Sequence, residues 1–323
     1  MDRGRQDGED HHRLDIAAIL EESMKLIGIL EMAAPDEDRL AYWQVFVEAL
    51  RTGGLIKDKD YALRLCWANG SKDRLTQAAQ DLVTDCVDVI VTAGTPAAAA
   101  AMQATSKIPI IMATGVSLGT NLSNPDGSTS SNATGISDLP RGISKLRLSL
   151  LREALAPAAK LAFLADRANP SSPLAVQETL AAASGLGIDV FVYWLEDWPQ
   201  IAKVLGKMLA DGVGGFVVAP GAMFFARRHE LASHALDHGL ATVAVRREYA
   251  EAGCLMAYGA PLHENYSVAA SLVSRILAGE KPSDIPVTEP TTFELVINLE
   301  SATALRITMP ASLLARAEIC PRS

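Results

Sequence analysis

The stretch from Val87 to Met102, VDVIVTAGTPAAAAAM, decides the fold of this chain. Its first half is a β-branched apolar run, which is typical of a strand buried on both faces. Gly94 permits a tight turn, Thr95 is a good N-cap, and Pro96 suits the first helical position. The alanines that follow favour a helix. The stretch therefore predicts a strand-to-helix turn whose first amides suit a carboxylate or phosphate, unless the turn simply faces water.

The same strand–helix alternation extends to both sides of this turn. Expected strands lie near Lys25–Glu31, Asp60–Ala68, Val87–Ala93 and Pro109–Thr114, with helices near Arg39–Thr52, Lys72–Asp85 and Pro96–Thr105. Alternation of this kind predicts a parallel sheet with helices on both faces. A stretch rich in Gly, Ser, Asn and Asp follows, from Gly119 to Pro140, and predicts a long loop.

The pattern then starts again in the second half of the chain. KLAFLADRANPSSP at 160–173 resembles KLIGILEMAAPDED at 25–38, and LADGVGGFVVAPG resembles VTDCVDVIVTAGT. The repeat predicts an α/β fold of two similar doubly wound parallel-sheet lobes. We expect a polar tail at 1–24, a first lobe at 25–140 with part of 255–290, and a second lobe at 141–254 with part of 291–323. Several crossovers would join the lobes as a hinge beside a central ligand cleft.

Composition excludes several classes of protein. The net charge of −9 argues against non-specific nucleic-acid binding. The four cysteines lack metal-type spacing, and we expect neither a metal nor a cofactor. No segment of the sequence is suited to spanning a membrane. The charged stretch before Lys25 has no apolar core of signal-peptide length.

Enzymatic motifs are also missing from the sequence. We find no dinucleotide-binding glycine motif, P-loop, G-x-S-x-G elbow or H-E-x-x-H pair. A two-lobe enzyme would need a nucleophile or an acid/base pair in the cleft, and a racemase-like cysteine pair fails because Lys160–Val245 contains no cysteine. The sequence therefore favours a binding protein over an enzyme.

Polar and aromatic residues gather where the expected strands end. Glu196 suits a ligand ammonium or a solvated turn, and Trp43 and Phe224 suit either stacking on a planar ligand or ordinary packing. In the first half of the chain the strand-end residues are Glu31, Tyr42, Trp43, Thr95, Pro96, Thr114, Gly115, Ser137 and Asp138; in the second half they are Asn169–Ser172, Glu196, Pro220–Phe224 and Arg246. Together they would suit an amino acid or an aromatic acid.

These features resemble the substrate-binding proteins of ABC importers, in the group that includes tryptophan/tyrosine-type binding proteins. The resemblance runs from about Lys25 to Glu318. Its most specific marks are VDVIVTAGTPAAAAA, SNATGISDL, FFARRHELASHA, EAGCLMAYG and PTTFELVINLESATALRITMPASLLARAE. It implies a type I periplasmic-binding fold that closes around a small solute and delivers it to a membrane permease, with no chemistry of its own.

The resemblance also implies roles and a location. It places Thr95-Pro96, Ala113–Gly115, Asn169-Pro170 and Pro220-Gly221 at the cleft. The predicted ligand-binding residues are Trp43, Thr95, Pro96, Thr114, Gly115, Ser137, Asn169, Glu196, Gly221, Phe224 and Arg246. We expect a transient permease partner, no nucleic acid, no membrane insertion and a periplasmic or extracytoplasmic location. The alternatives are a cytoplasmic sensory module without a transporter or, less favoured, a two-lobe enzyme.

Overall fold

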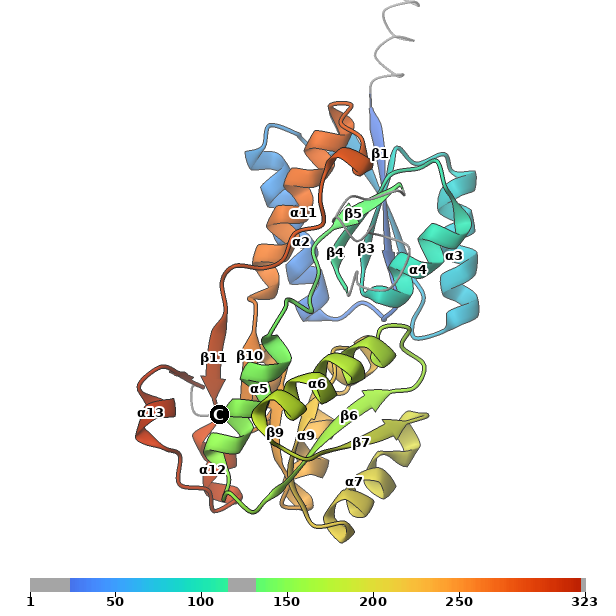
Figure 1. Ribbon diagram of the computed structural model, residues 1–323. Helices are drawn as coiled ribbons and strands as arrows, with labels where there is room; N and C mark the ends of the chain where they lie inside the picture. Colours follow the sequence, from blue (N-terminus) through green and yellow to red (C-terminus); the bar gives the residue numbers. More distant parts are fainter. Residues whose placement is uncertain (1–23, 116–131, 321–323) are drawn as a thin grey trace, which may run out of the picture.

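The computed structural model describes residues 24–115 and 132–320. The expected polar tail, apart from Met24, and most of the expected loop lie outside these residues. The described chain forms two α/β lobes, one above the other in Figure 1, each built around its own sheet. The prediction of two parallel-sheet lobes is confirmed.

The first lobe holds a five-stranded, fully parallel sheet. Its strand order is β2-β1-β3-β4-β5, with β1 at Lys25–Glu31, β2 at Tyr61–Trp67, β3 at Val89–Ala93, β4 at Ile110–Thr114 and β5 at Ala133–Gly135. Every residue of β3 and β4 is buried, as their apolar sequences require of central parallel strands.

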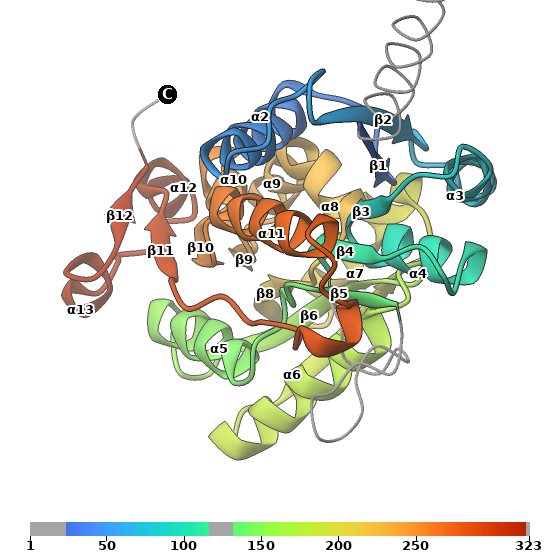
Figure 2. The same cartoon turned by 90° about the horizontal axis from the view of Figure 1, so that it is seen from above.

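Helices cover both faces of this sheet (Figures 1 and 2). One face carries α2 (Glu37–Thr52) and α11 (Leu262–Leu277), and the other carries α3 (Lys72–Thr84) and α4 (Thr95–Ala104). Each helix pair closes a separate apolar core against the strands. Helix α11 thus belongs to the first lobe although it follows most of the second lobe in the sequence.

The second lobe holds a seven-stranded sheet in the order β12-β11-β10-β9-β8-β6-β7. Only the pair β10–β11 is antiparallel. The strands are β6 (Lys160–Asp166), β7 (Val190–Leu195), β8 (Val213–Val218), β9 (Ala241–Ala244), β10 (Met256–Gly259), β11 (Glu294–Ile297) and β12 (Glu318–Ile319).

Helices again pack on both faces of the second sheet, around one large apolar core. They are α5 (Ile143–Ala154), α6 (Ser172–Leu186), α7 (Ile201–Ala210), α8 (Ala222–Ala226), α9 (Arg228–Asp237), α10 (Arg247–Glu251), α12 (Leu299–Ala304) and α13 (Ala311–Leu314), with short 3₁₀ turns η1 (Trp198–Gln200) and η2 (Pro282–Asp284).

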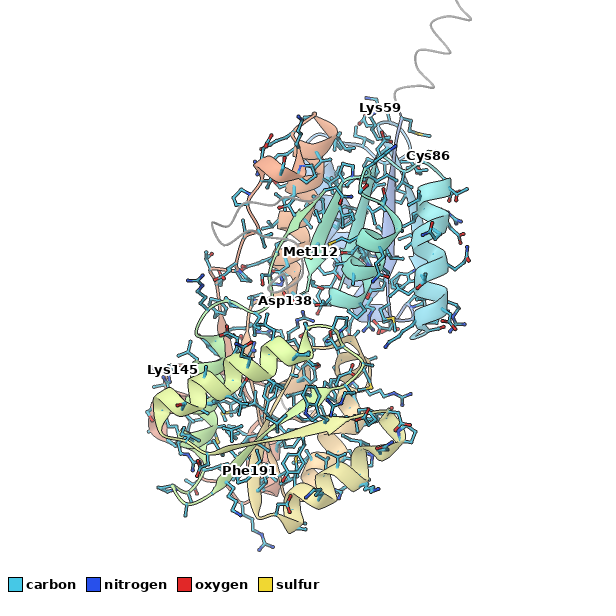
Figure 3. All side chains as sticks on the ribbon, turned by 45° about the vertical axis from the view of Figure 1, so that its right-hand side comes forward. Lys59, Cys86, Met112, Asp138, Lys145 and Phe191 are labelled. Carbon is cyan, nitrogen blue, oxygen red and sulfur yellow. The ribbon has the colours of Figure 1, made fainter. Side chains whose placement is uncertain are left out.

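The chain passes between the lobes after β5, after β10 and before β11. The first and third passages lie side by side, because the Ser137 amide donates to the Thr288 carbonyl at 2.9 Å and the Thr288 amide donates to the Gly135 carbonyl at 2.9 Å. Asp138 follows directly, and Figure 3 shows it at the junction of the lobes. Paired connections of this kind allow the lobes to rotate while keeping their edges together.

Candidate functional site

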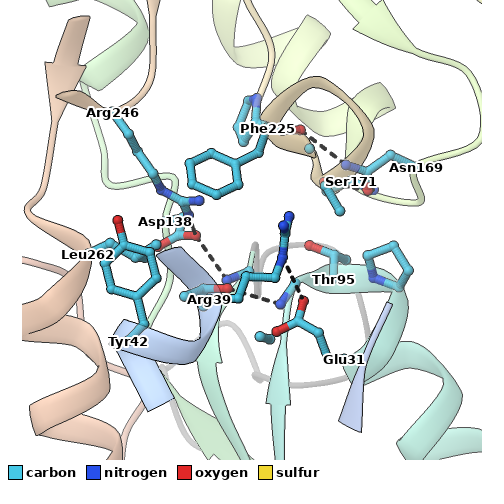
Figure 4. A pocket seen from close by; sticks show the side chains of 18 of the residues that line it. Glu31, Arg39, Tyr42, Thr95, Asp138, Asn169, Ser171, Phe225, Arg246 and Leu262 are labelled. Carbon is cyan, nitrogen blue, oxygen red and sulfur yellow. Dashed lines mark hydrogen bonds and ion pairs between the residues drawn. The ribbon is translucent and has the colours of Figure 1, made fainter. Parts of the chain in front are cut away.

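A cavity of about 60 Å³ lies between the lobes, at the carboxyl ends of strands from both sheets (Figure 4). We call it the chamber. The first lobe and its connections supply Glu31, Arg39, Tyr42, Ala93–Pro96, Thr114, Gly115, Asp138, Leu262 and Tyr266; the second lobe supplies Asn169, Ser171, Pro220–Ala222, Phe225 and Arg246. The edge of parallel strands where the chain crosses between lobes is the usual place for a ligand in α/β proteins.

The turn at the end of β3 forms one wall of the chamber. Helix α4 begins at Thr95, one residue earlier than expected, and Gly94 is its N-cap with φ of 89°. The Gly94 amide donates to Thr114 Oγ1 at 2.9 Å, which ties the ends of β3 and β4 together. A Cβ on Gly115 would lie 3.1 Å from the Thr95 nitrogen, so the two loops meet as closely as glycine allows.

The geometry at the start of α4 gives little support to the expected anion site. The amides of Ala97 and Ala98 both donate to the Gly94 carbonyl, at 3.1 and 3.2 Å. Pro96 has no amide hydrogen to offer. The turn therefore contributes a rigid wall more than a set of free donors.

Glu31, the last residue of β1, carries a buried carboxyl at the chamber wall. Its side chain is 5% exposed, and among the described residues Oε2 has no hydrogen-bond partner. Burial raises the pKa of Glu31 to about 7, although the nearby Arg39 guanidinium opposes the shift. A buried acceptor without a partner is costly unless a bound molecule supplies a donor. Contacts with Trp43 and the Ala33 backbone also favour the charged form of Glu31.

Arg39 lies across the chamber floor on the first turn of α2. Its Nε is 3.8 Å from Glu31 Oε1, and its guanidinium also pairs with Asp36, the N-cap of the helix. The guanidinium carbon lies 5.2 Å from the centre of the Phe225 ring, which belongs to the other lobe. Arg39 therefore brings a buried positive charge to the point where the lobes meet.

Arg246, just before α10, brings a second cation from the second lobe, with its side chain 17% exposed. Its Nη2 donates to Asp138 Oδ2 at 2.6 Å, and the same carboxylate accepts from Asn265 Nδ2 at 2.9 Å and from the Gly115 amide at 3.1 Å. Burial raises the pKa of Asp138, and Arg246 opposes that shift. This network joins both lobes and the crossover at one carboxylate.

Further contacts between α2 and the second lobe hold the chamber closed. The Tyr42 hydroxyl donates to Glu248, and Arg228 pairs with Asp38. Arg228 and Arg246 also lie over the Phe225 ring, with guanidinium carbons 4.9 and 5.7 Å from its centre. Phe225 is thus enclosed by three guanidinium groups from two lobes, and Figure 4 shows two of them, those of Arg39 and Arg246.

Seven of the predicted ligand-binding residues line the chamber: Thr95, Pro96, Thr114, Gly115, Asn169, Gly221 and Arg246. Within it, the Asn169 side chain is fixed, because its Nδ2 donates to the Pro220 carbonyl at 3.0 Å and its Oδ1 accepts from Ser171 Oγ at 2.9 Å. Strand-end position was the sequence signal shared by these residues.

Four predicted ligand-binding residues are not among those that line the chamber. Trp43 is buried in the first core, edge-on to Phe46 and Tyr266 with ring centres 5.5 and 4.9 Å away. Ser137 is buried in the crossover pairing with Thr288.

The other two of these residues lie in the second lobe. Glu196 is exposed and pairs with Arg167 at 3.1 Å, so it is the solvated turn residue of the two alternatives considered. Phe224 is fully buried in the second core, and its neighbour Phe225 takes the position at the chamber. Successive helical residues point about 100° apart, so one residue decides which ring faces the cleft.

Sequence reasoning missed Arg39, Phe225 and Tyr266 as chamber residues. Arg39 lies in the first turn of an amphipathic helix, where a charged side chain is expected to be solvated. Tyr266 is remote in sequence from the strands that it faces. Glu31 and Asp138 carried the strand-end signal but were not among the predicted contacts.

The part of the chain that the structure describes gives no support to a metal site or to a membrane-spanning helix. Residues 24–115 and 132–320 contain no group of three or more His, Cys, Asp or Glu side chains placed to hold a metal ion. None of the helices within these ranges combines the length and the hydropathy needed to cross a lipid bilayer.

Comparison with known proteins identifies the family. The family model described as "ABC transporter substrate binding protein" matches residues 29–320. No functionally curated protein matches the sequence.

Solved structures share the fold. An ABC domain from Streptococcus pneumonia in complex with L-Trp is 24% identical, with a TM-score of 0.84 over 92% of this chain and 99% of that chain. A conserved domain protein from Vibrio cholerae is 21% identical, with a TM-score of 0.82 over 92% and 99% of the two chains. A periplasmic solute binding protein from Actinobacillus succinogenes with bound D-allose is 17% identical, with a TM-score of 0.61 over 86% and 99%.

Proposed function

This chain belongs to the ABC transporter substrate binding protein family, and we propose that its solute is an α-amino acid whose charged head group lies in the chamber. Membership gives the coarse function, which is to bind a small solute for a membrane permease. The finer assignment rests on the chamber's charges and size. We also propose that the protein acts outside the cytoplasmic membrane and performs no chemistry on its ligand.

One observation carries the amino acid assignment: a buried carboxyl group, that of Glu31, lines the same chamber as two guanidinium groups. Glu31 suits an ammonium, and Arg39 and Arg246 attract a carboxylate. Each guanidinium already has a carboxylate partner in the protein, so the net charge around the chamber is close to zero. A zwitterion is compatible with such balanced charges, whereas an ion of one sign would leave an excess charge buried.

The chamber volume supports the same conclusion. A water needs roughly 10–15 Å³ of such volume, so about 60 Å³ corresponds to roughly four to six heavy atoms. An α-amino acid head has five heavy atoms. The neighbour that holds L-Trp in the same fold is consistent with a ligand of this class.

Capture by hinge closure follows from the placement of the contacts. Both lobes supply chamber walls, and the closing contacts of Tyr42, Asp38 and Arg39 are made across the lobes. A ligand favours the closed form only through contacts that the open form lacks. Contacts from Arg246 and Phe225 of the second lobe would supply that difference.

Isothermal titration calorimetry with three matched compounds tests the proposal. Phenylalanine carries both head charges, phenethylamine lacks the carboxylate, and 3-phenylpropanoate lacks the ammonium. We expect phenylalanine to bind at least about 10-fold more tightly than either analogue, because phenethylamine lacks the carboxylate that the guanidinium groups attract and 3-phenylpropanoate lacks the ammonium that suits Glu31. Equal affinities for the three compounds, or tightest binding of either analogue, would contradict an amino acid head site.

A further inference from the structure

A second, smaller cavity of about 20 Å³ lies where the chain passes between the lobes. We call it the hinge cavity. All three passages supply part of its wall, and the second lobe supplies the rest. The lining residues are Asp138 and Pro140 of the first passage, Ala260 of the second, Pro290 and Phe293 of the third, and Arg147, Pro220, Val245 and Arg246 of the second lobe.

Arg147 brings a buried guanidinium to this cavity from α5. The residue is only 4% exposed. Among the residues that the structure describes, it makes one hydrogen bond, from Nε to the Tyr258 carbonyl at 2.9 Å, and no ion pair. A guanidinium carries five N–H groups, so most of those of Arg147 have no acceptor in this part of the chain.

The charges that line the hinge cavity do not balance. Among the described residues Asp138 supplies the one carboxylate of the wall, and it is paired with Arg246 at 2.6 Å. Its oxygens also accept from Asn265 Nδ2 and from the Gly115 amide. Burial and the nearby Arg246 charge lower the pKa of Arg147 to about 10, so the group is still cationic at pH 7. One buried positive charge is therefore left without a counter-charge, which proteins usually avoid.

We propose that the hinge cavity binds a chloride ion, which accepts hydrogen bonds from Arg147 and Arg246. A water needs roughly 10–15 Å³ of such volume, so about 20 Å³ has room for a monatomic ion but not for a carboxylate or a phosphate. The wall also includes three prolines, which have no amide hydrogen to donate. A water in this place would leave the Arg147 charge uncompensated, whereas chloride supplies the missing negative charge.

The position of the cavity gives the ion a structural role. The first and third passages are already joined by the backbone bonds between Ser137, Thr288 and Gly135. Arg147 binds the carbonyl of Tyr258, which lies in β10 directly before the second passage. A chloride ion on Arg147 would therefore complete a connection between α5 and all three passages. The inference goes beyond the proposed function, because it does not depend on which solute the chamber takes.

Thermal unfolding of the full chain without any solute tests the site in solution. Chloride is raised from about 1 to about 200 mM, and sodium gluconate keeps the ionic strength constant. An ion that binds only the native state stabilises it by mass action, so we expect the melting temperature to rise by about 2–4 °C. Constant ionic strength separates this effect from general screening of surface charges.

Two variants should abolish the chloride-dependent shift by different means. Arg147→Gln removes the cation, and Val245→Ile adds a methylene to the wall while keeping both guanidinium groups. Val245→Ile keeps the test valid if Arg147→Gln does not fold. The matched controls are Arg141→Gln, at an exposed position before α5, and Val268→Ile, at an exposed position of α11. Both controls lie outside the hinge cavity and should retain the full shift.

Crystals of the full chain soaked in sodium bromide locate the ion directly, because bromide scatters X-rays anomalously. We expect an anomalous peak between the guanidinium groups of Arg147 and Arg246. A water at that point without a bromide peak would overturn the inference. A bromide peak without any chloride-dependent shift in melting temperature would indicate an adventitious ion only and would also overturn it.

The variants provide two further ways to contradict the site. An undiminished shift in Val245→Ile or in Arg147→Gln would mean that chloride binds elsewhere on the protein. Loss of the shift in Arg141→Gln would mean that the effect comes from the overall charge. These experiments contain no amino acid, so their failure would leave the proposed function untouched, and failure of the calorimetry described above would leave the chloride site untouched.

Discussion

The two lobes repeat one sequence pattern and use it differently. KLIGILE forms β1 and ends at Glu31, whereas KLAFLAD forms β6 and ends at Asp166 in the equivalent place. Asp166 accepts from the Ala168 amide at 2.8 Å and closes its own turn. Glu31 has one more methylene, and its Oε2 has no partner among the described residues. One acid closes a backbone turn of its own lobe, and the other lines the chamber.

The contrast shows how a duplicated fold acquires a one-sided site. Burial raises the pKa of both acids, and that of Glu31 reaches about 7. The Asp166 carboxylate is compensated by backbone hydrogen bonds, which favour its charged form. The Glu31 carboxyl lines the chamber, and Arg39, Trp43 and the Ala33 backbone favour its charged form without cancelling the effect of burial. The predictions below test this difference, from the largest expected effect to the smallest.

Stability of the unliganded protein should depend on pH through Glu31. A carboxyl whose pKa is higher in the folded state holds its proton more tightly there, so the free energy of unfolding falls as pH rises from about 4.5 to about 7. The full change is about 3 kcal/mol and levels off above that range. Urea unfolding of the wild type and of Glu31→Gln at several pH values measures it, and parallel curves would contradict the assignment. Asp166→Asn should alter the slope less.

Ligand affinity should separate the two acids next. Glu31→Gln removes the charged acceptor of the ligand ammonium and should weaken phenylalanine binding by about 10- to 100-fold. Asp166→Asn keeps the turn volume and serves as the control, with a change below about 3-fold. Calorimetry above pH 8, where Glu31 is ionised, gives the clearest contrast. Equal losses in the two variants would mean that the acids do not differ in role.

The reverse pattern is expected for folding. Asp166→Ala leaves the Ala168 amide without its acceptor and should lower the free energy of unfolding by about 1–2 kcal/mol. Its affinity for glycine, which fills only the chamber, should be unchanged. Chemical denaturation combined with glycine titration measures both quantities. A loss of glycine affinity without a loss of stability would reverse the roles we assign to the two lobes.

The contact between α2 and α10 should have the smallest effect. Glu248→Gln weakens the bond from the Tyr42 hydroxyl, which joins the lobes near the chamber. We expect the affinity to fall by less than about 5-fold, because other contacts also hold the closed form. Small-angle scattering should find the unliganded variant slightly more extended than the wild type. Unchanged scattering and affinity would show that this contact does not help to hold the closed form.

Much of the fold was predictable because the central strands carry their signal locally. The β-branched run that becomes β3 and the alanine-rich start of α4 agree with the structure to within two residues. Helix α5 had no predicted counterpart, because its buried face includes Ser144 and Arg147. Arg147 is buried beneath the crossover, where its Nε donates to the Tyr258 carbonyl at 2.9 Å. A buried charged residue of this kind interrupts the apolar pattern by which a helix is predicted from sequence.

The chamber was only partly predictable for a related reason. Residues on the wall from their own lobe, such as Thr95 and Asn169, follow strand ends and were named. Arg39 and Phe225 reach the chamber only because the other lobe covers them, and Phe224 differs from Phe225 by a single helical step. Local patterns state which side chains are apolar or charged. They do not state which ones meet across a cleft.

The late position of α11 in the sequence has a consequence for synthesis on the ribosome. Residues 24–135 supply every strand of the first sheet, but its α2 face is closed by Tyr266, Leu272 and Val273 of α11. The second sheet in turn gains β11 and β12 only at the end of the described chain. An emerging first lobe would thus expose apolar surface until most of the polypeptide has been made. Each half requires the other to finish folding, so the mature protein should melt in a single cooperative step despite its two lobes.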